Sequence, residues 1–142
     1  MNIISYKNLS LDKISVVGKD VKYDNESFYI QTPIIESSEI KNFNGRNYIQ
    51  LNFLISNAHD VFLKTLKKID KKISYLLDSE SFLLKDIHEK VSMKVNIPDT
   101  INVFYNKDKK CILPSEVYQK TKCICIIFLS NNEWSLYQYM RL

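Results

Sequence analysis

The sequence predicts a mainly β protein with one long helix, an α+β chain whose short strands close into a small antiparallel barrel. Several segments alternate apolar and polar residues, the period of two that marks a half-buried strand. One long segment, Ala58 to Leu77, repeats apolar residues every three or four positions, as an amphipathic helix does. Because closure of short strands hides the edges of a sheet, these observations favour a barrel, with an open α+β sandwich as the alternative.

The length and composition fit one soluble domain. The chain has 142 residues, of which 45% are hydrophobic and 25% charged, so we expect a single domain spanning residues 1–142. No stretch of about 18 apolar residues occurs, and the first residues lack the apolar core of a signal peptide. We therefore expect a cytoplasmic protein without a membrane partner.

The N-terminal part of the chain predicts three strands. Residues 14–17 and 21–23 are short apolar runs on either side of a turn at Gly18. Residues 27–32 form the third strand, which ends at Pro33 because proline cannot donate a hydrogen bond to a sheet ladder.

The most regular strand pattern covers residues 47–56, whose side chains alternate well between a mainly polar face and an apolar one. Its inward face carries Ile49, Leu51, Phe53 and Ile55. The polar stretch 36–47 before it contains the turn signal Asn44-Gly45 and is predicted as a longer loop.

The period changes from two to 3.6 residues after this strand, which predicts a helix of about five turns from Ala58 to Leu77. Asn57 or Asp60 is expected to cap its start. The predicted buried stripe consists of Phe62, Leu66, Ile69, Ile73 and Leu76. The opposite side carries Lys64, Lys67, Lys68, Lys71 and Lys72, which we expect to face solvent.

Further strands are predicted after the helix, at residues 91–97, 101–105, 120–129 and 133–140. Asn131 and Asn132 would join the last two as a hairpin. In the final strand one face carries Trp134, Leu136, Gln138 and Met140, and the other carries Ser135, Tyr137 and Tyr139. The charged stretch 85–90 is predicted as a solvated helix or loop.

The helix is therefore flanked by strands on both sides in the sequence. In the five-stranded oligonucleotide-binding (OB) barrel a helix lies between the third and fourth strands, and the predicted helix falls at the same place. This order favours an OB-like barrel with its helix between the third and fourth barrel strands.

The sequence offers no catalytic set, and we predict neither an enzyme nor a metal site nor a cofactor. Gly18 and Gly45, the only glycines, lie too far apart to build a phosphate-cradling loop. Cys123 and Cys125 share one face of a strand without two further zinc ligands, so we expect small buried thiols. His59 is expected on the surface or at the helix cap.

Aromatic and basic side chains recur together on the predicted strands. Tyr, Phe and Trp make up 12% of the chain, and its net charge is +4. Outward aromatic faces can stack bases, and neighbouring cations can follow a phosphate backbone, without dependence on base sequence. The stacking candidates are Tyr29, Tyr48, Tyr105 and Trp134. The candidates for phosphate contacts are Arg46, Lys94, Lys107, Lys109, Lys110, Lys120 and Lys122. The alternative is that these rings pack in the core or between copies of the chain.

A set of short motifs resembles one known family. They are FYIQTP at residues 28–33, LNF at 51–53, and a following helix that contains Phe62, Leu66, Ile69-Asp70 and Ile73. In this order they resemble the compact phage-type single-stranded DNA-binding proteins of nucleo-cytoplasmic large DNA viruses, and their counterparts on cytoplasmic linear (killer) plasmids of yeasts. The resemblance covers residues 23–77. It implies an OB barrel that coats single-stranded DNA during replication without catalysis, in the host cytoplasm or a virion.

Two functional hypotheses follow. In the first, the chain binds single-stranded DNA, with RNA as an alternative ligand, as a homo-oligomer that works with replication or transcription proteins. In the second, it is a non-catalytic structural or accessory subunit of a viral or virus-like assembly, such as a virion component or a polymerase subunit, and its outward tyrosines anchor an interface. A stoichiometric protein partner without oligonucleotide affinity would indicate the second.

Overall fold

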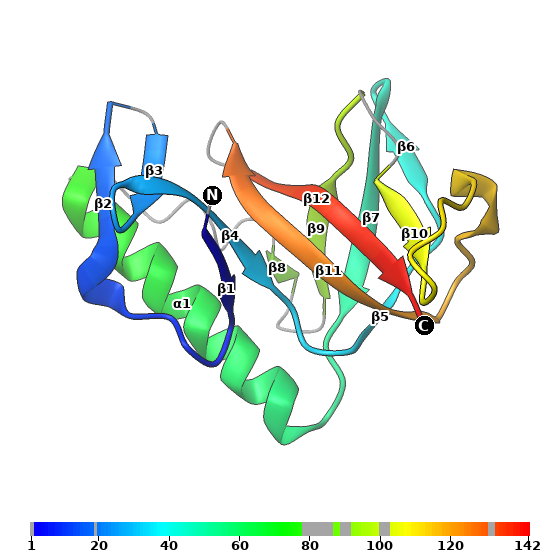
Figure 1. The fold of residues 1–142 in the computed structure, drawn as a ribbon, viewed down its shortest axis with the longest axis horizontal. Coiled ribbons are helices and arrows are strands. Elements are labelled where there is room, and N and C mark those ends of the chain that lie inside the picture. Colours follow the sequence, from blue (N-terminus) through cyan, green and yellow to red (C-terminus); the bar gives the residue numbers. More distant parts are fainter. Residues whose placement is uncertain (1, 19, 78–86, 89–91, 100–102, 131–132) are drawn as a thin grey trace.

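The computed structural model describes residues 2–18, 20–77, 87–88, 92–99, 103–130 and 133–142 (Figure 1). Its helical elements are α1 (Asn57–Leu77) and two short 3₁₀ turns, η1 (Leu11–Lys13) and η3 (Pro114–Glu116). The strands before α1 are β1 (Asn2–Ser5), β2 (Ile14–Val17), β3 (Asp20–Tyr23), β4 (Glu26–Gln31), β5 (Ile35–Ser37), β6 (Lys41–Phe43) and β7 (Arg46–Asn52). The strands after it are β8 (Ile87–His88), β9 (Ser92–Asn96), β10 (Phe104–Asn106), β11 (Thr121–Ser130) and β12 (Glu133–Arg141).

A closed 5-strand barrel forms the centre of the molecule, with the ring order β5, β7, β9, β12 and β11. Neighbouring strands of the ring are antiparallel, except β9 and β12, which run parallel. β4 precedes β5 and also pairs with β11. The prediction of a mainly β protein with one helix and a small barrel is confirmed.

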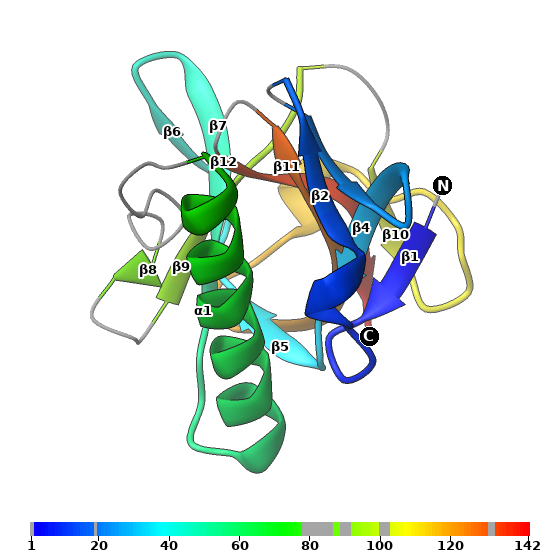
Figure 2. The same cartoon turned by 90° about the vertical axis from the view of Figure 1, so that its left-hand side faces the viewer.

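The position of α1 within the ring differs from the prediction. α1 follows β7, the second strand of the ring in chain order, and precedes β9, the third. The predicted place between the third and fourth barrel strands is wrong because β2 and β3 do not belong to the ring. They extend the sheet beyond β4 as an antiparallel hairpin, and β2 contacts α1 (Figure 2).

The inward residues of the ring strands and one stripe of α1 make a single core. Ile49 and Leu51 on β7 are fully buried, as are Met93 and Val95 on β9. The predicted helix stripe is confirmed for Phe62, Leu66, Ile69 and Ile73, while Leu76 stays exposed.

Several strand boundaries differ from those that the sequence predicts. β5 overlaps the stretch 36–47 predicted as a loop, and β6 lies inside it. Each is only three residues long, too short for the sequence to show a clear alternation. β7 ends at Asn52, and Ile55, predicted to face the core, is 107% exposed. β1 lies in parallel beside β4, and the two-residue β8 lies in the stretch predicted as a helix or loop. The predicted turn at 131–132 lies outside the described residues.

A bulge in β12 reverses the facing of its last residues. Ile126 pairs with Gln138 and Ile127 pairs with Leu136, so Tyr137 is an extra residue on β12. The prediction that Tyr139 faces outward with Tyr137 is therefore wrong: Tyr139 is fully buried, whereas Tyr137 is exposed.

Ser37, Tyr139 and Cys123 form hydrogen bonds inside the barrel. The hydroxyls of Ser37 and Tyr139 lie 2.7 Å apart, and the Cys123 thiol donates to the carbonyl oxygen of Ile35 at 3.4 Å. Burial raises the pKa of the Cys125 thiol well above its ordinary value, and burial likewise raises the pKa of Tyr139. The predicted buried strand thiols are confirmed, and the pKa of Cys125 keeps its sulfur protonated and inert.

His59 joins the segment before α1 to the loop between β4 and β5. Its Nδ1 accepts a hydrogen bond from the Leu54 N–H at 2.7 Å, and its Nε2 donates to the Ile34 carbonyl oxygen at 2.8 Å. The side chain is buried, so the expected surface position is wrong. Ser56, and neither Asn57 nor Asp60, caps the helix, because its Oγ accepts from the His59 N–H.

Replacement of His59 by alanine tests how much these two hydrogen bonds contribute to stability. His59→Ala leaves a backbone N–H and a carbonyl without partners, so we expect the free energy of unfolding to fall by about 1–3 kcal/mol. Urea denaturation followed by circular dichroism measures the change. Lys64→Ala, at an exposed position on α1, is the control and should stay within about 0.5 kcal/mol of the wild type. Equal stability of His59→Ala and wild type would contradict this role of the imidazole.

Alkylation of the native protein tests the closed interior. Iodoacetamide at mildly alkaline pH should modify Cys111, which is exposed, and should spare Cys123 and Cys125, which are buried. All three thiols should react after denaturation, and peptide mass spectrometry identifies the modified residues. Rapid modification of either strand cysteine in the native protein would show that the barrel opens to solvent.

Candidate nucleic-acid interface

One row of outward side chains crosses neighbouring strands of the barrel. Lys41 on β6 lies opposite Tyr48 on β7, which lies opposite Asn96 on β9. Asn96 pairs with Ser135 on β12, which lies opposite Phe128 on β11. Direct cross-strand partners point to the same side of a sheet. We call this row the outer band, together with the side chains that flank it: Tyr29, Phe43, Arg46, Lys94 and Tyr137.

Three aromatic rings gather at the β11 end of the outer band. The Tyr29 ring centroid lies 5.4 Å from that of Phe128 and 4.6 Å from that of Tyr137. The Phe128 and Tyr137 rings meet edge to face at 6.5 Å. Tyr137, the bulged residue, is 39% exposed, so part of this cluster faces solvent. The three rings are tilted by 45° to 84° against one another, so a base can stack on the exposed face of one ring at a time.

The other end of the outer band lies on the β6–β7 hairpin (Figure 1). Asn44 and Gly45 connect the two strands with positive φ angles of 51° and 80°, the conformation that a tight hairpin turn requires. Phe43 lies opposite Arg46 beside this turn and is 64% exposed. The hairpin therefore presents an apolar ring next to a guanidinium group.

Basic groups line the same end. The Lys94 ammonium lies 5.1 Å from the centre of the Tyr48 ring, a cation–π contact that keeps the charge over the outer band. Lys41 is the direct cross-strand neighbour of Tyr48. A base on Tyr48 would thus have two cations within reach of its phosphates.

Between the two ends lies a cavity of about 230 Å³. Its lining consists of Arg46, Asn96, Ile97, Pro98, Asp99, Phe128 and Ser135. Because Arg46 comes from the hairpin and Phe128 from the aromatic cluster, the cavity joins the two ends into one continuous surface.

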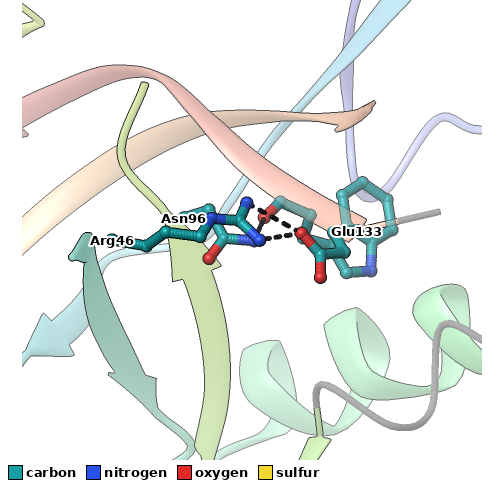
Figure 3. Close-up of polar contacts among 4 residues, drawn as sticks. Arg46, Asn96 and Glu133 are labelled. Carbon is teal, nitrogen blue, oxygen red and sulfur yellow. Dashed lines mark hydrogen bonds and ion pairs between the residues drawn. The ribbon is translucent and has the colours of Figure 1, made fainter. Parts of the chain in front are cut away.

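Glu133 contacts two of the residues that line this cavity, Arg46 and Asn96 (Figure 3). One carboxylate oxygen, Oε2, accepts from the Arg46 guanidinium at 2.9 Å and from the Asn96 amide at 3.0 Å. The Asn96 amide also donates to the Trp134 carbonyl oxygen at 3.4 Å. The side chain of Arg46 is 62% exposed, so this ion pair is weakly held and an external anion can compete for it.

A second cleft of about 400 Å³ lies further along β11 and β12. Its lining consists of Gln31, Tyr105, Lys109, Ile124, Ile126, Gln138 and Met140. Lys107 and Lys110 belong to the same exposed loop as Lys109. Two of the predicted residues, Tyr105 and Lys109, thus come together here and not on the outer band.

The remaining predicted residues lie elsewhere. Lys122 is exposed near the start of β11 opposite Glu36, six positions from Phe128 on the same strand, which is roughly 20 Å away. Lys120 precedes β11 and is also exposed.

Trp134 is the one predicted stacking residue that the structure excludes. Its side chain is fully buried in the core, so no base can reach the ring face. Its inward position follows from the alternation of β12 before the bulge, which the sequence shows, and burial of so large a ring is consistent with its apolar area.

Sequence reasoning missed Lys41, Phe43, Phe128 and Glu133 as members of this surface. The Asn44-Gly45 signal could have indicated a tight hairpin, and hence an outward Phe43. No local signal could have brought Glu133 beside Arg46, because these residues are 87 positions apart.

Two features, a cluster of metal ligands and a membrane-spanning helix, are absent from the described part of the chain. Within it, no three His, Cys, Asp or Glu side chains gather in a way that could hold a metal ion. Nor is any helix there long and apolar enough to cross a bilayer.

Comparisons with known proteins identify the fold. No protein-family model and no curated protein matches the sequence. The structure is similar to that of the single-stranded DNA-binding protein from bacteriophage Enc34 in complex with ssDNA, with a TM-score of 0.58, 15% identity, and coverage of 90% of this chain and 92% of that one. A C-terminal truncation of the same phage protein gives a TM-score of 0.56 and 14% identity over 93% of this chain and 96% of that one. The chain therefore has the fold of a phage single-stranded DNA-binding protein, an OB-like barrel.

Proposed function

We propose that this protein binds single-stranded DNA without sequence specificity and coats it during replication. The observation that carries the proposal is the outer band, where aromatic rings at both ends and cations at the β6–β7 end share one face of neighbouring strands. The resemblance of residues 23–77 to proteins of large DNA viruses and linear plasmids supports a role in the replication of such elements. The phage neighbour solved with bound ssDNA supports the same ligand.

Each part of the outer band has a separate task in this proposal. Tyr48 and the cluster of Tyr29, Phe128 and Tyr137 stack bases, because every base has an aromatic face whatever its identity. Lys94 and Arg46 contact the phosphates. Rings that lie against a sheet can reach bases only when these are unpaired, so the surface favours single strands over duplex.

The function is tested with a fluorescently labelled oligo-dT, whose anisotropy is titrated at several salt concentrations. Each phosphate contact should contribute about −0.7 to the slope of log affinity against log salt. Absence of binding, or binding with no salt dependence, would overturn the proposal and favour the alternative of a protein-binding subunit. Competition with unlabelled duplex and RNA establishes which nucleic acid is preferred.

Tyr48→Ala should weaken binding of oligo-dT by about 1–3 kcal/mol, because it removes one stacking face from the outer band. The matched control is Tyr75→Ala, at a tyrosine on α1 that is 82% exposed and distant in the fold from the outer band. Its affinity should equal that of the wild type. A loss of the same size in both variants would show that the effect is not local to the outer band.

Glu133→Gln should tighten binding and steepen the salt dependence by about 0.7, because the Arg46 guanidinium is freed for a phosphate. The glutamine oxygen can still accept from Asn96, so the variant isolates the charge. Asp12→Asn, an exposed carboxylate on η1, changes the net charge equally and should have little effect. The gain should vanish in the double variant Arg46→Ala/Glu133→Gln. Weaker binding by Glu133→Gln would mean that the carboxylate orients Arg46 and does not compete with DNA.

A further inference from the structure

The second cleft has the chemical character of a nucleobase site. Its volume of about 400 Å³ lies within the range of small-molecule sites, about 300–1,000 Å³. Ile124, Ile126 and Met140 supply an apolar floor, and Tyr105, which lies opposite Met140, supplies an aromatic wall. An apolar slot of this kind suits a flat heterocycle.

Two amides border this floor in a regular arrangement. Gln138 on β12 and Gln31 on β4 lie on either side of Ile126, each as its direct cross-strand partner. An amide presents both a donor and an acceptor, and it can rotate to match the edge of any base. The pair therefore suits a ligand that has mixed donors and acceptors at its rim.

Lys109 adds a positive charge at the same cleft. Its loop is fixed by Asn106, whose Oδ1 accepts from the backbone N–H groups of Asp108 at 2.9 Å and Lys110 at 3.0 Å. Lys109 itself has a φ of 64°, an unfavourable left-handed conformation that an L-residue adopts only when its surroundings impose it. The loop thus fixes the backbone from which the Lys109 side chain lines the cleft, with Lys107 and Lys110 in the same exposed loop.

The cleft also continues the outer band. Ile126 is two residues from Phe128 on β11, and Gln138 follows Tyr137 on β12, so the cleft begins where the aromatic cluster ends. A strand that stacks on Tyr29 and Phe128 would reach the cleft with its next nucleotides.

From this geometry we infer that the second cleft is a nucleotide subsite, in which one unstacked base of the bound strand rests on Ile126 and Met140 while a phosphate of the same strand meets Lys109. This inference rests on the proposed function and deepens it. The amides at the rim give the subsite contacts to the base edge, which the aromatic cluster lacks.

Oligomers of two lengths test the subsite. Lys109→Ala and Ile126→Phe, which fills the cleft with a ring, are titrated with oligo-dT of about 5 and about 10 nucleotides, within the usual site sizes. We expect each variant to lose at least about fivefold in affinity for the longer oligomer, and less than twofold for the shorter one. Lys71→Ala, which removes an exposed cation from α1, is the control and should bind both as wild type does. Gln31→Ala/Gln138→Ala replaces Ile126→Phe if that variant does not fold.

A photochemical readout locates the base directly. Irradiation of a complex with 5-iododeoxyuridine-substituted oligomer should crosslink it to Tyr105 or Met140, identified by mass spectrometry. Unchanged affinity of the cleft variants at both lengths, with crosslinks confined to Tyr29, Tyr48 and Phe128, would overturn the subsite and leave the proposed function intact. Failure of the wild-type protein to bind any oligomer would overturn the proposed function itself.

Discussion

When β11 pairs with β12 on one side and with β5 on the other, the sheet closes, and every ring strand has one face inside and one outside. The inside must be apolar or internally hydrogen-bonded, because water cannot enter to satisfy polar groups. The protein meets this demand with aliphatic residues, with the buried Trp134, and with the Ser37–Tyr139 hydroxyl pair. Side chains on the outer face can contact water and need be neither apolar nor paired with one another. The rings and cations of the outer band lie on this face.

Much of this architecture could be predicted from the sequence because it follows from local periodicity. The alternation of β7 and β9 and the apolar stripe of α1 each depend on residues only a few positions apart. The placement of Arg46, Tyr48 and Lys94 on one surface follows from the same alternation, once β7 and β9 are paired. Only the pairing of β7 with β9 is a contact between distant segments, and the rest of these features follow from neighbouring residues.

The rest depended on pairings between distant segments, which a single sequence does not display. Whether β2 and β3 belong to the ring or extend beyond it is decided by the pairing of β3 with β4 and of β4 with β11. The burial of Tyr139 depends on a register shift opposite Ile126. The contact of Glu133 with Arg46 exists only because β12 and the β6–β7 hairpin both lie beside β9. These strand pairings and registers can be seen only in the three-dimensional structure.

The extra residue Tyr137 shifts the alternation of β12, so that the positions that face the core change from even-numbered before the bulge to odd-numbered after it. Before the bulge the even-numbered Trp134 and Leu136 are buried in the core, and after it the odd-numbered Tyr139 is buried. Tyr137 and Tyr139, which are two positions apart, therefore lie on opposite faces of β12, whereas a regular strand would place both on the same face. Because Tyr137 is the extra residue, deleting it would leave Gln138 opposite Ile126 and Tyr139 opposite Cys125, each with its present orientation, and would remove only the outward ring.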